Sequence, residues 1–422
     1  MKSHWMKTWL LVAGVISLVF GHCESMAHAQ KGGRWKMGMP IVTYWAGPAM
    51  TDAAARQLAE GGWNVVWCGE KELDVAQRHG LRGQLTDPLL APEALADPTK
   101  REALDALISR VRKHPALYCY FITDEPDAGK FQELGKLVAY LKEKDPKHLA
   151  YINLFPTYAS NEQLGNRGDT VTAYKAHLKQ YVEVVKPALI SYDHYQFAIK
   201  SDLPDYFLNL ALVRNAAMEA GVPFLNIVQA CTWDPAMREP KQPEMRYLIY
   251  TSLAYGATGI SYYVYSHPGH SPGIATLDGK TTHVYDWLKT LNPEFTAIAS
   301  EVQPLRSSGV FHAGMMPPGA VPLPINSPFT LDPAVSAMEF KKGEPVKGVL
   351  LGCFGRKDSG VSGSTHAVVV NLDYRADATI NLRGPHNLEV FDATTRAWTP
   401  RSDRHVTLNL PPGGGVLVRV GR

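Results

Sequence analysis

The alternation of apolar, strand-like runs with amphipathic helical stretches is the feature that most constrains the fold of this chain. Between about residues 38 and 302, eight apolar runs are separated by stretches with apolar residues three and four positions apart. The runs are "MPIVTYW", "WNVVWCG", "LRGQLTD", "ALYCYFITDE", "LAYINLFP", "ALISYDHY", "PFLNIVQACTW" and "GISYYVYS". Because strands that alternate with helices form a buried parallel sheet, and eight such units have the size of a closed barrel, we predict a (β/α)8 TIM barrel.

The sequence after residue 302 has a different pattern. Short alternating strands with Gly and Pro turns, such as "THAVVVNLDY" and "HVTLNL", predict a small antiparallel β-sandwich. We therefore predict a barrel over 30–302 and a C-terminal β-sandwich over 303–422. A doubly wound dinucleotide-binding sheet is disfavoured, because the first turn, "YWAGPAMTD", contains no G-x-G-x-x-G.

The N-terminus has the features of a secretory signal peptide. A basic start is followed by an apolar stretch that is short for a membrane span, and then by Ala27-His28-Ala29. We predict a signal peptide over 1–29, cleavage after Ala29, a secreted or periplasmic mature protein, and no membrane span in it. Four cysteines follow this segment, and without C-x-x-C spacing they are interpreted as buried core residues, with a single disulfide left open: Cys68, Cys119, Cys231 and Cys353.

The charge and the aromatic content narrow the range of partners. The formal net charge is +3 and basic residues are spread along the chain, so no patch for nucleic acid is expected. Nine Trp and nineteen Tyr are more than packing requires, and their flat amphipathic rings suit the faces of sugars. The oligomeric state does not follow from the sequence.

Catalytic residues of such barrels lie at the carboxyl ends of the strands, where the loops form an open mouth. The polar and aromatic residues predicted at those ends are Tyr44, Trp45, Glu70, Asp87, Asp124, Glu125, Asp127, Asn153, Tyr192, Asp193, His194, Tyr195, Gln229, Trp233, Tyr263, Tyr265 and His267. The aromatic members are candidate sugar platforms or core residues. Gln229 and Asn153 are candidates to bind sugar hydroxyls or to hydrogen-bond within the barrel.

The fourth run ends in "TDEP", which places two carboxylates at the barrel mouth. Because side chains alternate along a strand, Asp124 and Glu125 point in different directions, and Pro126 ends the strand. A like charge nearby and partial burial raise the pKa of a carboxyl, as a general acid near neutral pH requires. The alternative is that Asp124 caps the next helix and Glu125 is solvated.

The segment "YFITDEP" resembles the fourth strand of (β/α)8 glycoside hydrolases of the broad clan A type, in which a Glu preceded by Asn or Asp is the acid/base. "INLFP", "LISYDHYQF" and "YLIYTSLAYGATGISYYVYS" resemble segments of exported bacterial glycosidases related to β-galactosidases. The resemblance implies a glycoside hydrolase with a carbohydrate substrate, Glu125 as acid/base and no cofactor.

The sequence departs from the clan pattern on the seventh strand, where Gln229 lies near the position of the nucleophilic Glu. One interpretation makes Asp193 the second carboxylate, as nucleophile or as base according to its distance from Glu125. The other is substrate-assisted cleavage of N-acetylated sugars by Asp124 and Glu125, as in family 123 hexosaminidases. Tyr192 or Tyr195 then holds the acetamido oxygen.

Two further classes of function remain open. A metal-dependent hydrolase is suggested by His267 and His270, with Asp193 and His194 across the mouth, although the strand-1 H-x-H and H-E-x-x-H motifs are absent. A barrel without its nucleophile is also compatible with a non-catalytic carbohydrate-binding protein, because fold does not determine function.

Overall fold

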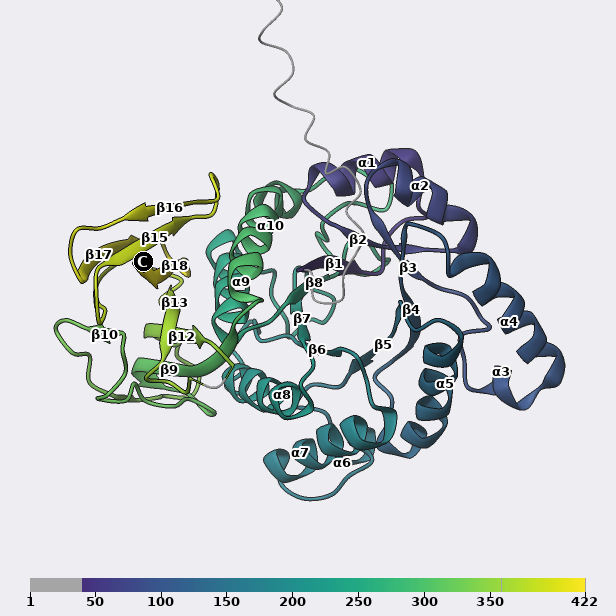
Figure 1. Ribbon diagram of the computed structural model, residues 1–422, viewed down its shortest axis with the longest axis horizontal. Coiled ribbons are helices and arrows are strands. Elements are labelled where there is room, and N and C mark those ends of the chain that lie inside the picture. The colour runs from purple at the N-terminus through teal and green to yellow at the C-terminus, as the bar shows by residue number, and fades with distance from the viewer. Residues whose placement is uncertain (1–39, 358, 422) are drawn as a thin grey trace, which may run out of the picture. The chain divides into compact units, whose positions relative to one another are not determined.

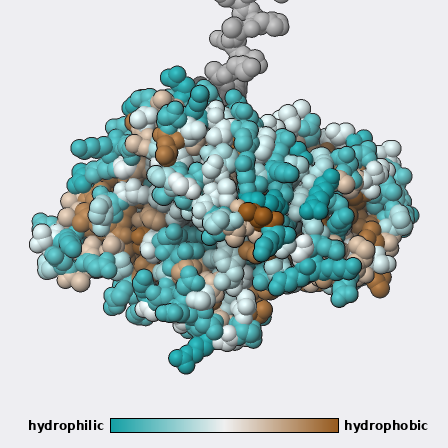
Figure 2. Space-filling view, turned by 180° about the vertical axis from the view of Figure 1, so that it is seen from behind, coloured by the Kyte–Doolittle hydropathy of each residue, from teal (hydrophilic) through white to brown (hydrophobic). Residues whose placement is uncertain are grey.

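The computed structural model describes residues 40–357 and 359–421. The predicted signal peptide and its cleavage site lie outside the described residues. Within the described part of the chain, no helix is both long and apolar enough to cross a membrane. Figure 2 shows one face of the molecule, on which hydrophilic residues predominate and apolar ones form small separate groups.

Eight parallel strands form a TIM barrel, as the sequence predicts. Their order is β1-β8-β7-β6-β5-β4-β3-β2, and the N–H of Asn64 donates to the carbonyl of Val42 where β1 meets β2. The strands are β1 Ile41–Trp45, β2 Val65–Cys68, β3 Arg82–Leu85, β4 Leu117–Asp124, β5 Leu149–Leu154, β6 Ile190–His194, β7 Phe224–Gln229 and β8 Gly259–Tyr263.

The helices lie around these strands (Figure 1). They are α1 Asp52–Glu60, α2 Leu73–Arg78, α3 Glu93–Ala96, α4 Pro98–Val111, α5 Phe131–Lys144, α6 Asn161–Leu164, α7 Thr170–Gln180, α8 Tyr206–Ala220, α9 Gln242–Tyr255 and α10 His283–Val302, with short helical turns η1 Glu70–Glu72, η2 Ala128–Lys130 and η3 Tyr181–Val185. Side chains such as Thr51 and Asp97 cap their first turns by accepting backbone N–H groups.

The period of two along each strand divides the barrel core into two layers. One layer fills the barrel interior and includes Ile41, Cys119 and Ile227, with Trp45 and Tyr263 at its upper edge. The other layer lies between strands and helices and is much larger. Neighbouring residues of one strand therefore face different surroundings.

Two β-sheets follow the barrel and pack face to face around one apolar cluster, which confirms the predicted C-terminal β-sheets. The strands are β9 Arg306–Met316, β10 Thr330–Leu331, β11 Met338–Glu339, β12 Gly348–Gly355, β13 Ser364–Asn371, β14 Ala378–Arg383, β15 Leu388–Asp392, β16 Ala397–Pro400, β17 His405–Leu410 and β18 Gly415–Val420. The pairing is antiparallel except between β11 and β9. The long strand β9 was not predicted from the sequence.

Helix α9 links the barrel to these sheets. It contacts β12 and β13, and nearly all of its residues from Glu244 to Tyr255 are buried. A helix buried on nearly all sides has no continuous polar stripe, and the buried hydroxyls of Thr251 and Ser252 in α9 donate to backbone carbonyls of the same helix. The four cysteines are buried and free, so none of them forms a disulfide within the described residues.

Candidate active site

The end of β4 brings two carboxylates to the barrel mouth. The register of β4 against β5 shifts between Phe121 and Thr123, and this irregularity aligns Asp124 with Asn153. Glu125 follows with φ of 43°, a left-handed conformation that a residue with a side chain rarely adopts, and its N–H donates to the carbonyl of Asn153 at 2.9 Å. Strained backbone of this kind is concentrated at functional sites.

Asn153 connects this strand end to β6. Its Nδ2 donates to Asp124 Oδ1 at 3.0 Å, and its Oδ1 accepts from the hydroxyl of Ser191 at 3.0 Å. Tyr151 is hydrogen-bonded to the same hydroxyl at 2.7 Å. Both the nitrogen and the oxygen of this buried amide therefore form hydrogen bonds, and the bond from Asn153 orients the carboxylate of Asp124.

The end of β6 contributes a third carboxylate. Asp193 is 6% exposed, and its Oδ2 accepts from the hydroxyl of Tyr195 at 3.0 Å. Its Oδ1 is buried and receives no hydrogen bond from any donor in the described part of the chain. A buried carboxylate oxygen without a donor is costly, so this group favours the protonated state or a shared proton.

Glu125 and Asp193 meet across the mouth, where the Asp193 carboxyl donates a hydrogen bond that stabilises the ionised form of Glu125. Such a bond requires a proton on one of the two carboxyls. Burial, followed by the charge of Asp124, raises the pKa of Glu125 to about 7. Burial, followed by the charges of Glu125 and Asp124, raises the pKa of Asp193 well above its ordinary value. Two carboxyls that share one proton are a feature of acid/base pairs in enzymes.

Asp124 completes the cluster from the solvent side. Its side chain is exposed at the mouth, yet partial desolvation by the surrounding protein raises its pKa, against the effect of the hydrogen bond from Asn153. Its charge acts on both other carboxyls. The structure thus brings together the three residues predicted as catalytic.

Aromatic side chains surround Asp193. The ring of Tyr195 lies 4.9 Å from that of Trp233 and 5.0 Å from that of Tyr263, and Trp233 and Tyr263 are also 5.0 Å apart. These three predicted residues form an aromatic cluster beside the carboxyl pair, where an apolar sugar face can pack.

Tyr158 is a site residue that the sequence analysis missed. It lies in the loop after β5, is 45% exposed, and its hydroxyl accepts the N–H of Tyr195 at 3.3 Å. Burial and then the charges of Asp193 and Glu125 raise its pKa, which places the phenol beside the carboxyl pair. Tyr158 lies in "FPTYAS", just beyond the end of the fifth predicted strand. Only this position, after a strand of the barrel, could have indicated Tyr158 from the sequence.

Four predicted binding residues face away from the mouth. Tyr44, Tyr192, His194 and Tyr265 are fully buried in the layer between strands and helices. His194 Nδ1 is 2.9 Å from Oδ1 of Asn209, and burial lowers the pKa of His194 to about 4. These four side chains lie on the opposite face from the residues that point into the barrel, so the structure does not bring them to the carboxyl cluster.

Gln229 is also a structural residue in this fold. Its Oε1 accepts the N–H of Phe197, and its Nε2 donates to the carbonyls of Phe197 and Arg238 at 3.2 and 2.8 Å. The amide therefore joins the loop after β6 to the loop after β7 and has no group left for a sugar. Glu244, the first carboxylate of the following helix α9, pairs with Arg238 and accepts the N–H of Lys241.

Three further carboxylates at strand ends have local roles. Glu70 pairs with Arg110, Asp87 accepts the N–H of Leu89, and Asp127 accepts the N–H of Gly129 at the start of η2. Asp127, rather than Asp124, is therefore the helix cap after β4.

The residues proposed for a metal site do not converge. His267 and His270 contact each other through their Nδ1 atoms at 3.1 Å, and His270 Nε2 is 2.9 Å from the hydroxyl of Tyr263. His194 points to Asn209 on α8 instead of joining them. Across residues 40–357 and 359–421, no group of three or more His, Cys, Asp or Glu side chains has the arrangement of a metal site.

Comparison with known proteins supports the fold assignment. No family model matches the sequence, and no curated protein matches it significantly. Among solved structures, a catalytic mutant of a family 42 β-galactosidase from G. stearothermophilus matches with a TM-score of 0.58 and 10% identity, over 92% of this chain and 99% of that one.

Two other matches have lower scores. A β-galactosidase from the psychrophilic Marinomonas ef1 has a TM-score of 0.46 at 12% identity, over 66% of this chain and 63% of that chain. A family 27 β-L-arabinopyranosidase from Geobacillus stearothermophilus has a TM-score of 0.46 at 9% identity, over 91% of this chain and 97% of that chain. The match to the family 42 β-galactosidase confirms the predicted resemblance to (β/α)8 glycoside hydrolases at the level of the fold.

Proposed function

We propose that this protein is an exported glycoside hydrolase in which Glu125 is the general acid/base and Asp193 the second catalytic carboxylate. The observation that carries the proposal is the hydrogen-bonded pair of these two carboxyls at the barrel mouth, with both pKa values raised. A group with a pKa of about 7 is about half protonated at neutral pH, so it can both donate a proton to a leaving glycosidic oxygen and take one back.

The spacing of the pair supports retention of anomeric configuration. Inverting pairs are roughly 6.5–9.5 Å apart and hold a water between them, whereas retaining pairs are roughly 5–5.5 Å apart. Because Glu125 and Asp193 lie close enough for a hydrogen bond between them, we propose the shorter, retaining arrangement.

In the proposed reaction, Glu125 gives its proton to the glycosidic oxygen as the bond to the anomeric carbon breaks. The proton that the pair shares lies on Glu125 when the substrate is bound, so Asp193 is then a carboxylate, held by the hydroxyl of Tyr195, and it forms the covalent bond to that carbon. Glu125, now ionised, then takes a proton from the water that releases the sugar and regenerates Asp193. Atoms and charge balance without a cofactor.

A second mechanism is supported by the position of Asp124. Its side chain reaches solvent at the mouth next to Glu125, as substrate-assisted cleavage of N-acetylated sugars requires. Of the two tyrosines considered for holding the acetamido oxygen, Tyr192 faces the helices, so Tyr195 has that role in this version. It predicts that Asp124→Asn is inactive, that Asp193→Asn retains activity, and that only N-acetylated sugars are cleaved.

The experiment is hydrolysis of a panel of p-nitrophenyl glycosides and polysaccharides by the wild type and Glu125→Gln. We expect Glu125→Gln to lose about 10²–10⁴-fold in kcat/KM on polysaccharides. The control is Glu294→Gln, since burial also raises the pKa of Glu294, which accepts from Tyr250 between α9 and α10. If the wild type and Glu125→Gln both bind sugar and neither cleaves it, the protein is a carbohydrate-binding protein and the proposal fails.

Export has its own test. The proposal requires that the mature protein begin at Gln30, which N-terminal sequencing of protein recovered outside the cytoplasm measures directly. An intact Met1 on the active protein contradicts it.

A further inference from the structure

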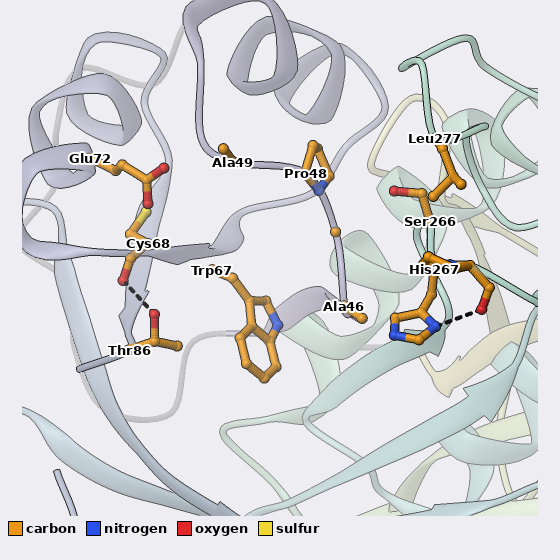
Figure 3. A pocket seen from close by; sticks show the side chains of 12 residues that line it. Ala46, Pro48, Ala49, Trp67, Cys68, Glu72, Thr86, Ser266, His267 and Leu277 are labelled. Atoms are coloured by element: carbon orange, nitrogen blue, oxygen red, sulfur yellow. Dashed lines mark hydrogen bonds between the residues drawn. The ribbon is translucent and has the colours of Figure 1, made fainter. Parts of the chain in front are cut away.

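A separate pocket opens at the same end of the barrel as the carboxyl cluster. It has a volume of about 470 Å³ and is lined from the ends of β1, β2 and β3 and from the loop after β8. In Figure 3, Trp67 lies between Cys68, Glu72 and Thr86 on one side and Ala46, Ser266 and His267 on the other. Its volume is in the range of small-molecule sites, roughly 300–1,000 Å³.

A row of aromatic rings connects this pocket to the carboxyl pair. Trp67 lies 5.0 Å from Trp45 and 4.7 Å from Phe121. Trp45 is the register partner of Tyr263, whose ring lies 5.0 Å from Tyr195, the residue that donates to Asp193. The floor between the two parts of the mouth is therefore aromatic, as suits sugar rings laid end to end.

Trp67 is fixed as part of this surface. Its Nε1–H donates to the carbonyl of Tyr44 at 2.7 Å, and the two neighbouring aromatic rings support the indole from the side. A rigid, preoriented ring loses little entropy when a ligand packs on it.

The polar wall of the pocket carries a fixed negative charge. Glu72 Oε1 accepts the N–H of Met50 at 2.8 Å and its Oε2 accepts the N–H of Gly69 at 2.6 Å. These bonds hold the carboxylate in place without neutralising it. A ligand with its own carboxylate is repelled there, so a neutral ring fits better than a uronic acid.

We propose that this pocket binds a second, neutral sugar residue of the substrate, so that the protein acts on oligosaccharides or polysaccharides rather than on single glycosides. The inference rests on the proposed function, because the cleaved bond is assigned to Glu125 and Asp193. It adds a subsite on β1–β3 with Trp67 as its platform.

The first test measures binding without turnover, in the Glu125→Gln background. Calorimetry measures the dissociation constants of three monosaccharides, galactose, glucose and mannose. It compares each with the dissociation constant of the corresponding β-linked trisaccharide. We expect one of the trisaccharides to bind more tightly than its monosaccharide, and Trp67→Ala to weaken the trisaccharide by about ten- to thirty-fold while the monosaccharide changes little.

Two further variants separate lost contacts from lost stability. Trp398→Ala, a partly buried tryptophan of β16 that donates to Glu301, is the matched control and should leave trisaccharide binding unchanged. Ala49→Trp adds a ring at an exposed residue of the pocket rim and removes no packing. It should weaken trisaccharide binding as Trp67→Ala does.

The outcomes distinguish this inference from the proposed function. If neither Trp67→Ala nor Ala49→Trp alters trisaccharide binding, or if both weaken the monosaccharide equally, the subsite is refuted even when Glu125→Gln is inactive. If Glu125→Gln hydrolyses as well as the wild type, the proposed function fails, and the binding data still show whether the pocket holds a sugar. A uronic acid trisaccharide that binds as tightly as the neutral one overturns the assigned ligand class.

Discussion

The two ends of the barrel each contain a buried aspartate, and the pKa values of these two residues move in opposite directions. Asp193 at the mouth is 6% exposed and Asp145, which precedes β5 at the other end, is 2% exposed. Burial raises the pKa of both. For Asp145, hydrogen bonds from His148 and Tyr120 overcome that effect and lower the pKa below its ordinary value. For Asp193, the charges of two other carboxyls add to it.

The difference lies in the partners rather than in the burial. Asp145 Oδ2 is 2.7 Å from both the hydroxyl of Tyr120 and Nδ1 of His148, and Oδ1 accepts the N–H of Lys147. In Asp193, by contrast, Oδ2 accepts a hydrogen bond from the hydroxyl of Tyr195, and Oδ1 accepts none from the residues that the structure describes. The lower end of the barrel is built for stability, whereas the mouth keeps carboxyls in an unfavourable environment that chemistry can use.

The largest expected effect is that of Asp193→Asn on catalysis. The variant keeps the shape of the side chain but removes the carboxylate that we assign as nucleophile, so kcat/KM should fall at least about 10³-fold. It should not lower the free energy of unfolding at pH 7, because an amide cannot ionise, whereas ionisation of Asp193 favours the unfolded chain. Kinetics on the best glycoside of the panel, together with urea denaturation, test both statements. Full activity of Asp193→Asn contradicts the comparison and supports the substrate-assisted mechanism.

Asp145→Asn should show the reverse result. Replacing this carboxylate leaves donors without their charged acceptor in a buried site, which costs about 1–3 kcal/mol in the free energy of unfolding. Because Asp145 lies at the end of the barrel remote from the mouth, kcat/KM should stay within about two-fold of the wild type under conditions where the variant is folded. A large loss of kcat/KM in the folded variant breaks the distinction between the two ends.

The sequence was sufficient for much of this comparison. The eight strand-like runs predicted the barrel, and "TDEP" and "SYDHY" predicted the carboxyls of Glu125 and Asp193 at strand ends. Within "SYDHY", however, Tyr192 and His194 were predicted as binding residues together with Tyr195. The period of two assigns them to the opposite face, but which face is inward depends on the register against neighbouring strands.

Other features depended on contacts between distant segments. Trp67 was overlooked because it is an apolar residue at the end of a strand, and its role depends on Trp45 and Phe121 beside it. The approach of Glu125 to Asp193 follows an irregularity in β4 and a left-handed backbone conformation at Glu125, which no spacing in the sequence reveals. Strand β9 was missed because its first residues, "RSSG", lack an apolar alternation.

The pH dependence of stability sharpens the comparison, because the two aspartates predict opposite slopes. The folded pKa of Asp193 is raised, so in the wild type the unfolded chain releases this proton first and the free energy of unfolding falls as pH rises above about 4. The advantage of Asp193→Asn over the wild type should therefore grow from pH 4 to pH 7. The folded pKa of Asp145 is lowered, so its contribution is complete above about pH 4 and is lost at lower pH. Denaturant titrations of both variants at several pH values measure these slopes, and equal slopes contradict the assignment.

The smallest effect is expected at the loops that carry the aromatic cluster of the mouth. The hydroxyl of Tyr374, in the loop after β13, donates to Asp202 Oδ2 at 2.6 Å, and Asp202 Oδ1 accepts from Arg238 at 2.9 Å. The carbonyl of Arg238 is one of those that bind Gln229, so a residue of the C-terminal sheets helps to hold the loops after β6 and β7.

Tyr374→Phe should therefore loosen these loops while leaving the carboxyl pair intact. The loss of one hydrogen bond, about 1 kcal/mol, predicts an increase in KM of about two- to five-fold with kcat nearly unchanged. Tyr250→Phe is the control, since it loses the same kind of bond, to Glu294, between α9 and α10. It should lower Tm comparably without changing KM. Equal changes in KM for the two variants would mean that Tyr374 contributes only to general stability.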